Sequence, residues 1–95
     1  MLARRVRTAA GEVDVVAEKA GLVAFVEVKR AASLAGAAVA LSARQRARLM
    51  RSAEILLGER PEWGSGGARF DVVLVDAAGS VRRIADAFRL ETSDL

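Results

Sequence analysis

The sequence contains no cysteine and no histidine, and it has a single proline and few aromatic residues. Without cysteine there are no disulfides, thiolate nucleophiles or zinc fingers, and without histidine there is no Ser-His-Asp triad and no imidazole base. Any acid–base or metal chemistry must therefore use carboxylates, lysine or metal-bound water. The class of metal that suits such ligands is a hard cation, Mg²⁺ or Mn²⁺.

Long apolar runs are also missing. None exceeds about eight residues, whereas a membrane-spanning helix needs about 20. The N-terminus passes from Met1-Leu2 straight into arginines, unlike a secretory signal peptide. The sequence therefore predicts a cytoplasmic protein without a membrane partner. Its 95 residues, 53% of them apolar, predict one domain over residues 1–95, and because the core is small a homodimer is one expectation.

The charge is unevenly distributed along the chain. Residues 1–60 carry 11 Arg or Lys against 6 Asp or Glu, whereas residues 61–95 carry 4 against 6. A basic front part suits a polyanionic partner such as a nucleic acid. From the charge alone, an arginine-rich solvated surface is the simpler explanation.

The hydrophobic pattern predicts an α/β fold, with a mixed sheet of about five strands and one main helix. Alternating β-branched residues indicate strands, Ala20-Gly21 indicates a hairpin turn, and Ser42 is a typical helix N-cap. Gly58 and Pro61 are expected to end that helix. The expected elements are an edge strand within residues 1–10, strands at 12–18 and 22–29, a loop at 31–41, the helix at 43–57, strands at 70–75 and 81–84, and a tail at 89–95.

The predicted hairpin carries charges inside two otherwise apolar strands. With a two-residue turn, Asp14 lies opposite Glu27 and Glu12 lies opposite Lys29. Opposite side chains of an antiparallel pair share a face, with Cβ atoms about 4.5–5.5 Å apart. All four charges are then expected on one patch. The apolar neighbours expected to fill the other face are Val13, Val15, Val26 and Val28.

Two explanations of this patch remain open from the spacing. Facing carboxylates repel each other, and either a bound divalent cation or a nearby ammonium would relieve the repulsion. Asp14 and Glu27 with a main-chain carbonyl and waters would form an ordinary Mg²⁺ site, beside which Lys29 could assist a water or neutralise a phosphate. A surface salt-bridge ladder from Glu12 to Lys29 accounts for the same residues.

The predicted helix has a basic face that could follow a phosphate backbone. Arg44, Arg48 and Arg51 recur at the spacing of one helix face, and Gln45 could also contact phosphate. A solvated helix face is the alternative. Two other residues are assigned structural roles. Asp71 is expected to be a carboxylate that caps a turn, and Trp63 is expected to shield the end of the sheet, with stacking on a base as the alternative.

The hairpin motifs resemble a known family. G-E-x-D at residues 11–14, followed by F-V-E-V-K at 25–29, resembles the YraN-like family of small bacterial proteins. That family is similar to the PD-(D/E)xK restriction-endonuclease-like superfamily, close to archaeal Holliday junction resolvases. The resemblance covers about residues 3–88, and its further motifs are SARQRARLMRSAEILL at 42–57, RFDVV at 69–73 and IADAF at 84–88.

The resemblance implies a restriction-endonuclease-like mixed sheet and a metal-dependent endonuclease that cleaves DNA, with branched or junction DNA as its expected substrate. Asp14 and Glu27 would bind Mg²⁺ or Mn²⁺ with the carbonyl of Val28. Lys29 would assist the attacking water, and Glu12 would be an additional acidic residue. The implied nucleic-acid-binding residues are Arg30, Arg44, Gln45, Arg48 and Arg51.

The chain departs from the family pattern in three places. Members usually begin with a helix that carries a glutamate, whereas this chain begins almost at its first strand. The segment after Lys29 is more apolar than usual, and Gln45 stands where the family often has lysine. These departures favour a second hypothesis, a non-catalytic nucleic-acid-binding or interaction module that keeps the nuclease-like sheet.

Overall fold

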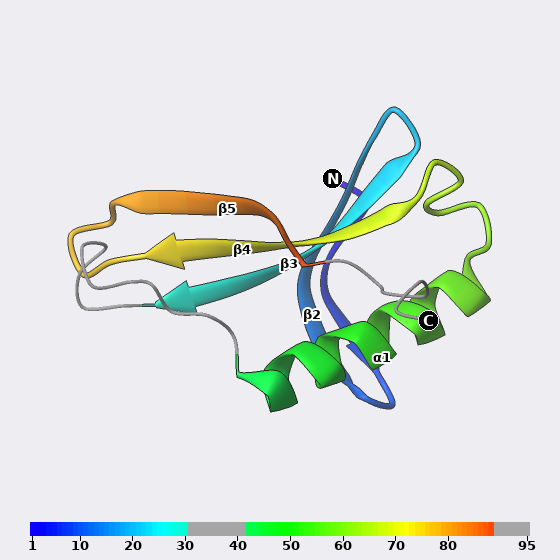
Figure 1. Ribbon diagram of the computed structural model, residues 1–95, viewed down its shortest axis with the longest axis horizontal. Coiled ribbons are helices and arrows are strands. Elements are labelled where there is room, and N and C mark those ends of the chain that lie inside the picture. Colours follow the sequence, from blue (N-terminus) through cyan, green and yellow to red (C-terminus); the bar gives the residue numbers. More distant parts are fainter. Residues whose placement is uncertain (31–41, 89–95) are drawn as a thin grey trace.

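The structure is a five-stranded mixed sheet with one helix packed on it, which confirms the predicted α/β fold (Figure 1). The computed structural model describes residues 1–30 and 42–88, with side chains described through residue 83, so the loop predicted at 31–41 and the tail at 89–95 lie outside the described residues. The elements are β1 (Ala3–Thr8), β2 (Gly11–Lys19), β3 (Leu22–Arg30), α1 (Ala43–Glu59), β4 (Ala68–Val75) and β5 (Val81–Phe88).

The strands follow one another across the sheet in chain order, so β1 and β5 form its edges. Strands β3 and β4 are parallel and are connected through α1, whereas the other neighbouring pairs are antiparallel. A tight turn reverses the direction of the chain and so joins antiparallel strands, whereas two parallel strands need a longer crossover connection of this kind. The helix found in residues 42–88 is not long and apolar enough to cross a membrane.

The β2–β3 hairpin has the two-residue turn that the sequence predicts. Ala20 and Gly21 have φ values of 54° and 85°, which match the left-handed turn that follows the twist of the strands. The pairing runs from Lys19–Leu22 to Val15–Val26, so the predicted register is confirmed over this part of the hairpin.

Helix α1 begins at the predicted N-cap. The Ser42 side chain accepts a hydrogen bond from the Gln45 N–H, and the Gln45 side chain accepts one from the Ser42 N–H, forming a capping box. The helix continues past Gly58 and ends at Glu59, so the prediction that Gly58 ends it is wrong. Glycine adopts helical φ and ψ values at modest cost. The helix ends before Pro61, because the residue that precedes a proline is disfavoured in the helical conformation and Arg60 has a non-helical ψ of 77°.

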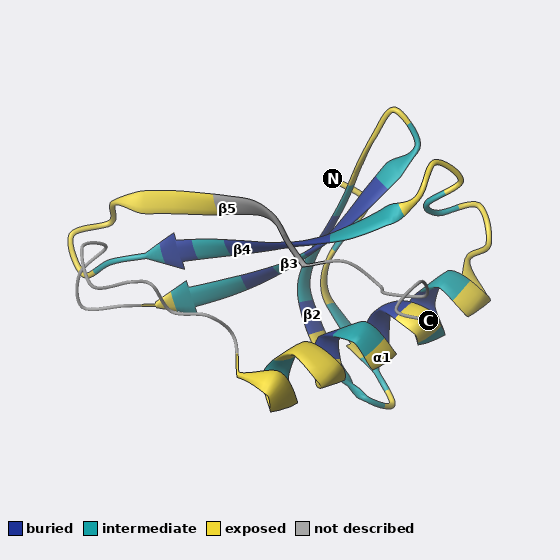
Figure 2. Cartoon of the chain, viewed as in Figure 1, coloured by how far each residue is buried: buried dark blue, intermediate teal, exposed yellow. Residues whose placement is uncertain are grey.

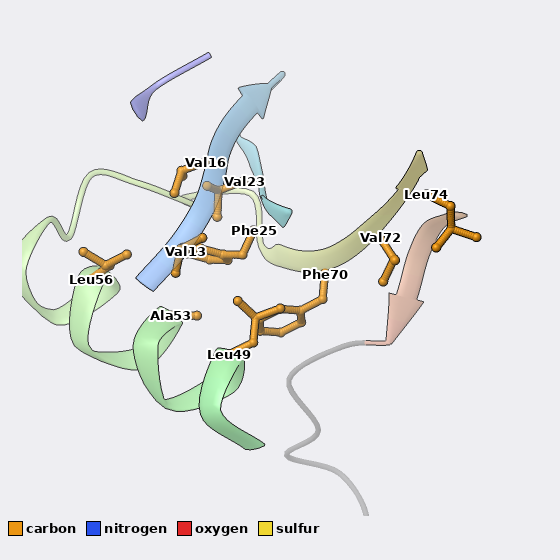
Figure 3. Close-up of a cluster of buried hydrophobic side chains, with 10 residues drawn as sticks. All are labelled: Val13, Val16, Val23, Phe25, Leu49, Ala53, Leu56, Phe70, Val72 and Leu74. Atoms are coloured by element: carbon orange, nitrogen blue, oxygen red, sulfur yellow. The ribbon is translucent and has the colours of Figure 1, made fainter. Parts of the chain in front are cut away.

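One core lies between α1 and the sheet (Figure 3). It is centred on Phe25 and Phe70, whose ring centroids are 5.7 Å apart. Trp63 packs against this core, in agreement with its predicted shielding role. The central parts of β2, β3 and β4 are buried, whereas the first turn of α1 and the connecting turns are exposed (Figure 2). The buried core residues are Val13, Val16, Val23, Phe25, Leu49, Ala53, Leu56, Phe70, Val72 and Leu74.

Strand β2 does not alternate as predicted. Val13 and Val16 are both fully buried in the core under α1, although residues three apart in a regular strand point to opposite faces. Only Val15 of the expected β2 pair lines the opposite sheet face, together with Val26 and Val28. The prediction that Val13 shares that face is therefore wrong.

A backbone irregularity in β1 lies opposite the change of face in β2. β1 pairs Arg4 with Val15 and Val6 with Val13, and between these pairs Arg5 has a φ of 51°. A left-handed residue rotates its own strand locally, and this one lies opposite the part of β2 between Val13 and Val15, where the side chains change face. Because this position is an arginine and not a glycine, the sequence did not predict a left-handed residue here.

Candidate functional site

The candidate site lies where strands β2 and β3 separate. Their pairing ends at Val15–Val26. The first half of β2 continues beside β1, and the last half of β3 continues beside β4, as far as Arg30 opposite Val75. In Figure 1 the β1–β2 pair runs away from the β3–β4 pair at this point. We call this opening, between residues 12–14 of β2 and 27–29 of β3, the fork.

Asp14 spans the fork. Its Oδ2 accepts a hydrogen bond of 2.7 Å from the Val28 N–H. A side-chain carboxylate therefore occupies the place of a main-chain acceptor on β2. This bond satisfies a β3 amide that strand separation would otherwise leave without a partner from β2, and it fixes the carboxylate beside Glu27.

Glu27 is buried at the fork on the face covered by α1. Its Oε2 accepts a 3.3 Å hydrogen bond from the Arg48 guanidinium, whereas its Oε1 is buried without a hydrogen-bond partner among the described residues. Burial raises the pKa of the Glu27 carboxyl, and the charge of Asp14 raises it further. Arg48 and Lys29 oppose this effect.

These residues fit a hard divalent cation. A buried carboxylate oxygen without a hydrogen-bond partner, next to a second carboxylate, is a coordination position that a cation would fill. Among the described residues no group of three or more acidic, histidine or cysteine side chains gathers around one point. A cation here would therefore take two carboxylates and would complete its shell with a main-chain carbonyl and waters, as Mg²⁺ commonly does.

The structure brings together three of the four predicted charges. Asp14, Lys29 and Glu27 lie close enough for the first two to shift the pKa of the third. Glu12 is exposed and lies opposite Arg7 of β1, and Lys29 lies opposite Leu74 of β4. The expected Glu12–Lys29 pair thus falls where the two strands have already separated.

The predicted basic residues of α1 divide into two groups. Arg48 reaches Glu27, and its side chain covers Gly11, where a Cβ atom would approach the Arg48 Cδ to 2.9 Å. Gln45 belongs to the capping box. Arg44, Arg51 and, at the end of β3, Arg30 are exposed and open to a partner.

Sequence reasoning missed two polar features. Thr8 donates a 3.1 Å hydrogen bond to the Ser52 hydroxyl and ties the β1–β2 turn to α1. Asp71 does not cap a turn as expected, because it is buried between Arg69 at 3.3 Å and Arg83 at 2.9 Å. No local motif signals the Thr8–Ser52 or Asp71–Arg83 contact, since these partners are 12 or more residues apart in the chain, whereas Arg69 lies two residues before Asp71 on β4.

The comparison with known proteins identifies the family. The model of the uncharacterised protein family UPF0102 matches residues 1–75. A UPF0102 protein of Granulibacter bethesdensis is 56% identical over 91 residues, which cover 96% of this chain and 58% of the relative. The chain belongs to the UPF0102 family. This assignment agrees with the resemblance to the YraN-like proteins.

Other UPF0102 relatives are similar over the same region. The protein of Azorhizobium caulinodans is 45% identical over 91 residues, covering 96% of this chain and 70% of the relative. That of Paramagnetospirillum magneticum is 50% identical over 82 residues, covering 86% and 64%. This UPF0102 chain thus spans little more than half the length of the Granulibacter relative and about two thirds of the others.

Proposed function

We propose that this UPF0102 chain carries a metal-dependent nuclease centre at the fork. Asp14 and Glu27 hold Mg²⁺ or Mn²⁺ with the Val28 carbonyl, and the substrate is a phosphodiester of DNA. The observation that carries the proposal is the buried Glu27 Oε1, which has no hydrogen-bond partner among the described residues and lies beside Asp14. The family resemblance makes branched DNA the first substrate to test.

The chain's own groups have distinct roles in this proposal. A divalent cation held at the fork would polarise the phosphodiester and lower the pKa of a bound water. Lys29 is half-buried next to Glu27, where its ammonium neutralises charge that develops on the phosphate or holds the attacking water. Arg48 holds Glu27 from the α1 side, so it positions the carboxylate rather than the substrate. Glu12, exposed on β2, is proposed as an additional acidic residue near the substrate.

A cleavage assay tests this function. The protein is incubated with Mg²⁺ or Mn²⁺ and either junction or linear DNA, alongside Asp14→Asn and Glu27→Gln. Asp14→Asn keeps an oxygen for the Val28 N–H and so separates chemistry from folding. Glu54→Gln, an exposed change on α1, is the matched control. We expect the two fork variants to lose cleavage and the control to retain it. Absence of cleavage by the unaltered chain, with no metal binding by calorimetry, would refute the proposal.

The second candidate is a non-catalytic nucleic-acid-binding module. It is favoured by the structural partner that each carboxylate already has, the Val28 N–H for Asp14 and Arg48 for Glu27. Under this alternative, DNA affinity falls with salt but is unchanged by chelator and by Asp14→Asn. Metal-dependent binding or cleavage that Asp14→Asn abolishes excludes it.

A further inference from the structure

A second basic site lies on the opposite side of the fork from Arg48. A cavity of about 370 Å³ is lined by Arg4, Arg5, Arg30, Asp14, Val15 and Val28. Val15 and Val28 belong to the sheet face away from α1, so this cavity opens on that face. Asp14 therefore lies between the Glu27–Arg48 pair on one side and three further arginines on the other.

The backbone of β1 explains why two consecutive arginines line one cavity. Successive side chains of a regular strand point to opposite faces. Arg5 instead has a left-handed φ of 51°, between the regular pairs Arg4–Val15 and Val6–Val13. A non-glycine residue rarely adopts this conformation, and such strain gathers at functional sites. Its effect here is that both arginines line the same cavity as Asp14.

The charge of the cavity selects an anionic ligand. Three arginines and a single carboxylate line the cavity, and the Oδ2 of that carboxylate is already bonded to the Val28 N–H. Within the described part of the chain, Arg4, Arg5 and Arg30 form no ion pair, since the pairs found there join Arg48 to Glu27 and two other arginines to Asp71. Guanidinium groups bind phosphate oxygens through paired hydrogen bonds.

We propose that Arg4, Arg5 and Arg30 form a seat for a backbone phosphate of the nucleic acid. This phosphate neighbours the phosphodiester that reacts at Asp14 and Glu27, so the nucleic-acid strand runs past the Asp14 side of the fork. The inference rests on the proposed function for its substrate class. The three arginines act as positioning residues, since they hold the strand and leave the reacting group to the carboxylates.

The seat is tested by DNA binding in EDTA, where no metal chemistry contributes. Fluorescence anisotropy with a labelled junction measures affinity across a range of salt for Arg4→Gln, Arg5→Asn and Arg30→Gln. Asparagine tolerates the left-handed conformation, so Arg5→Asn removes charge and leaves the backbone as it is. Arg82→Gln, an exposed arginine of β5, is the matched control.

We expect each seat variant to weaken DNA binding at least about fivefold. The three substitutions together should reduce the magnitude of the negative slope of log affinity against log salt by about 0.7–0.9, the value for one phosphate contact. Arg82→Gln should leave both quantities near those of the unaltered chain. Arg5→Gly should also raise the melting temperature by about 4 °C, since glycine relieves the left-handed strain.

The outcomes separate the seat from the nuclease proposal. If the chain binds DNA through these arginines without cleaving it, the seat stands and the nuclease function fails. If the chain cleaves DNA and the seat variants behave like Arg82→Gln in both binding and KM, the seat is overturned. The seat is also overturned if Arg5→Gly is less stable than the unaltered chain and binds DNA normally. The left-handed conformation of Arg5 would then store no strain, and its side chain would bind no phosphate.

Discussion

Replacing Glu27 by glutamine should make the metal-free protein more stable and abolish stabilisation by metal. Gln has nearly the shape of Glu but no charge. The raised pKa of Glu27 means that its ionised form is disfavoured in the fold, first by burial and then by Asp14. Its only described ion pair, at 3.3 Å, joins it to an Arg48 side chain that is 43% exposed and can return to water. Removing one partner of a buried pair is costly when the other charge stays buried, but Arg48 can return to water, so we expect the effect of replacing a whole pair at its lower end, a stabilisation of about 1 kcal/mol.

Metal binding changes the free energy of unfolding in favour of the unaltered chain rather than of Glu27→Gln. A cation present at ten times its dissociation constant stabilises the folded state by about 1.4 kcal/mol. For a domain of this length this corresponds to a rise in melting temperature of about 6–11 °C. Glu27→Gln removes one of two carboxylates from the proposed site, so this rise should disappear. In chelator, the variant should melt about 4–8 °C above the unaltered chain.

The pH dependence gives the same reasoning an independent check. A folded-state pKa raised above the ordinary 4.5 means that protonated Glu27 favours the fold at low pH, and that this advantage is lost as pH rises through the raised value. In EDTA, the stability difference between Glu27→Gln and the unaltered chain should therefore be smallest below pH 4.5 and should grow toward neutral pH.

Differential scanning fluorimetry with Mg²⁺, Mn²⁺ or EDTA measures all three effects, with Glu54→Gln as a control for surface charge. Equal metal shifts in the unaltered chain and Glu27→Gln would refute the assignment of Glu27 as a ligand. A destabilised Glu27→Gln in EDTA at pH 7 would refute the electrostatic argument, because the Arg48 pair would then outweigh the burial of charge.

Three other predictions concern the fork, the turn and the uncovered sheet face. Asp14→Ala should lower the free energy of unfolding by about 1–3 kcal/mol in urea titrations, because it leaves the Val28 N–H without its acceptor. Asp14→Asn should lower it by less than half of this amount, and equal losses for the two variants would contradict the hydrogen bond. Ala20→Gly should stabilise the protein by about 0.5–1 kcal/mol, since Ala20 has a φ of 54°, and no gain would argue against the left-handed turn. The proposed homodimer would cover the apolar sheet face that includes Val26, so light scattering should give twice the chain mass and Val26→Lys should halve it; a monomeric mass for the unaltered chain would exclude it.

Local chemistry predicted the elements well, and tertiary contacts account for what it missed. Ala20-Gly21 fixed the hairpin turn, and Ser42 fixed the start of α1, because both signals act within four residues. The left-handed Arg5 gave no such signal, since arginine has no preference for that conformation. The strand alternation therefore failed at Val13, where prediction and structure assign opposite faces.

The candidate site was predictable in its residue types and only partly in its geometry. Asp14, Glu27 and Lys29 were recognisable because a two-residue turn brings the strands of a hairpin together in a known register. Sequence could not show that the strands separate at Val15. It also could not show that Arg48 meets Glu27, since that contact depends on how α1 packs across the sheet.

The separation of β2 and β3 has a spectroscopic consequence. The Val28 amide is bonded to the Asp14 carboxylate, so its proton senses a side chain instead of a neighbouring strand. Coordination of a cation by that carboxylate and arrival of a phosphate beside it would each alter the strength of this one hydrogen bond. In NMR titrations with metal or with DNA, the Val28 amide resonance should thus report both events in the unaltered chain, without any substitution at the fork.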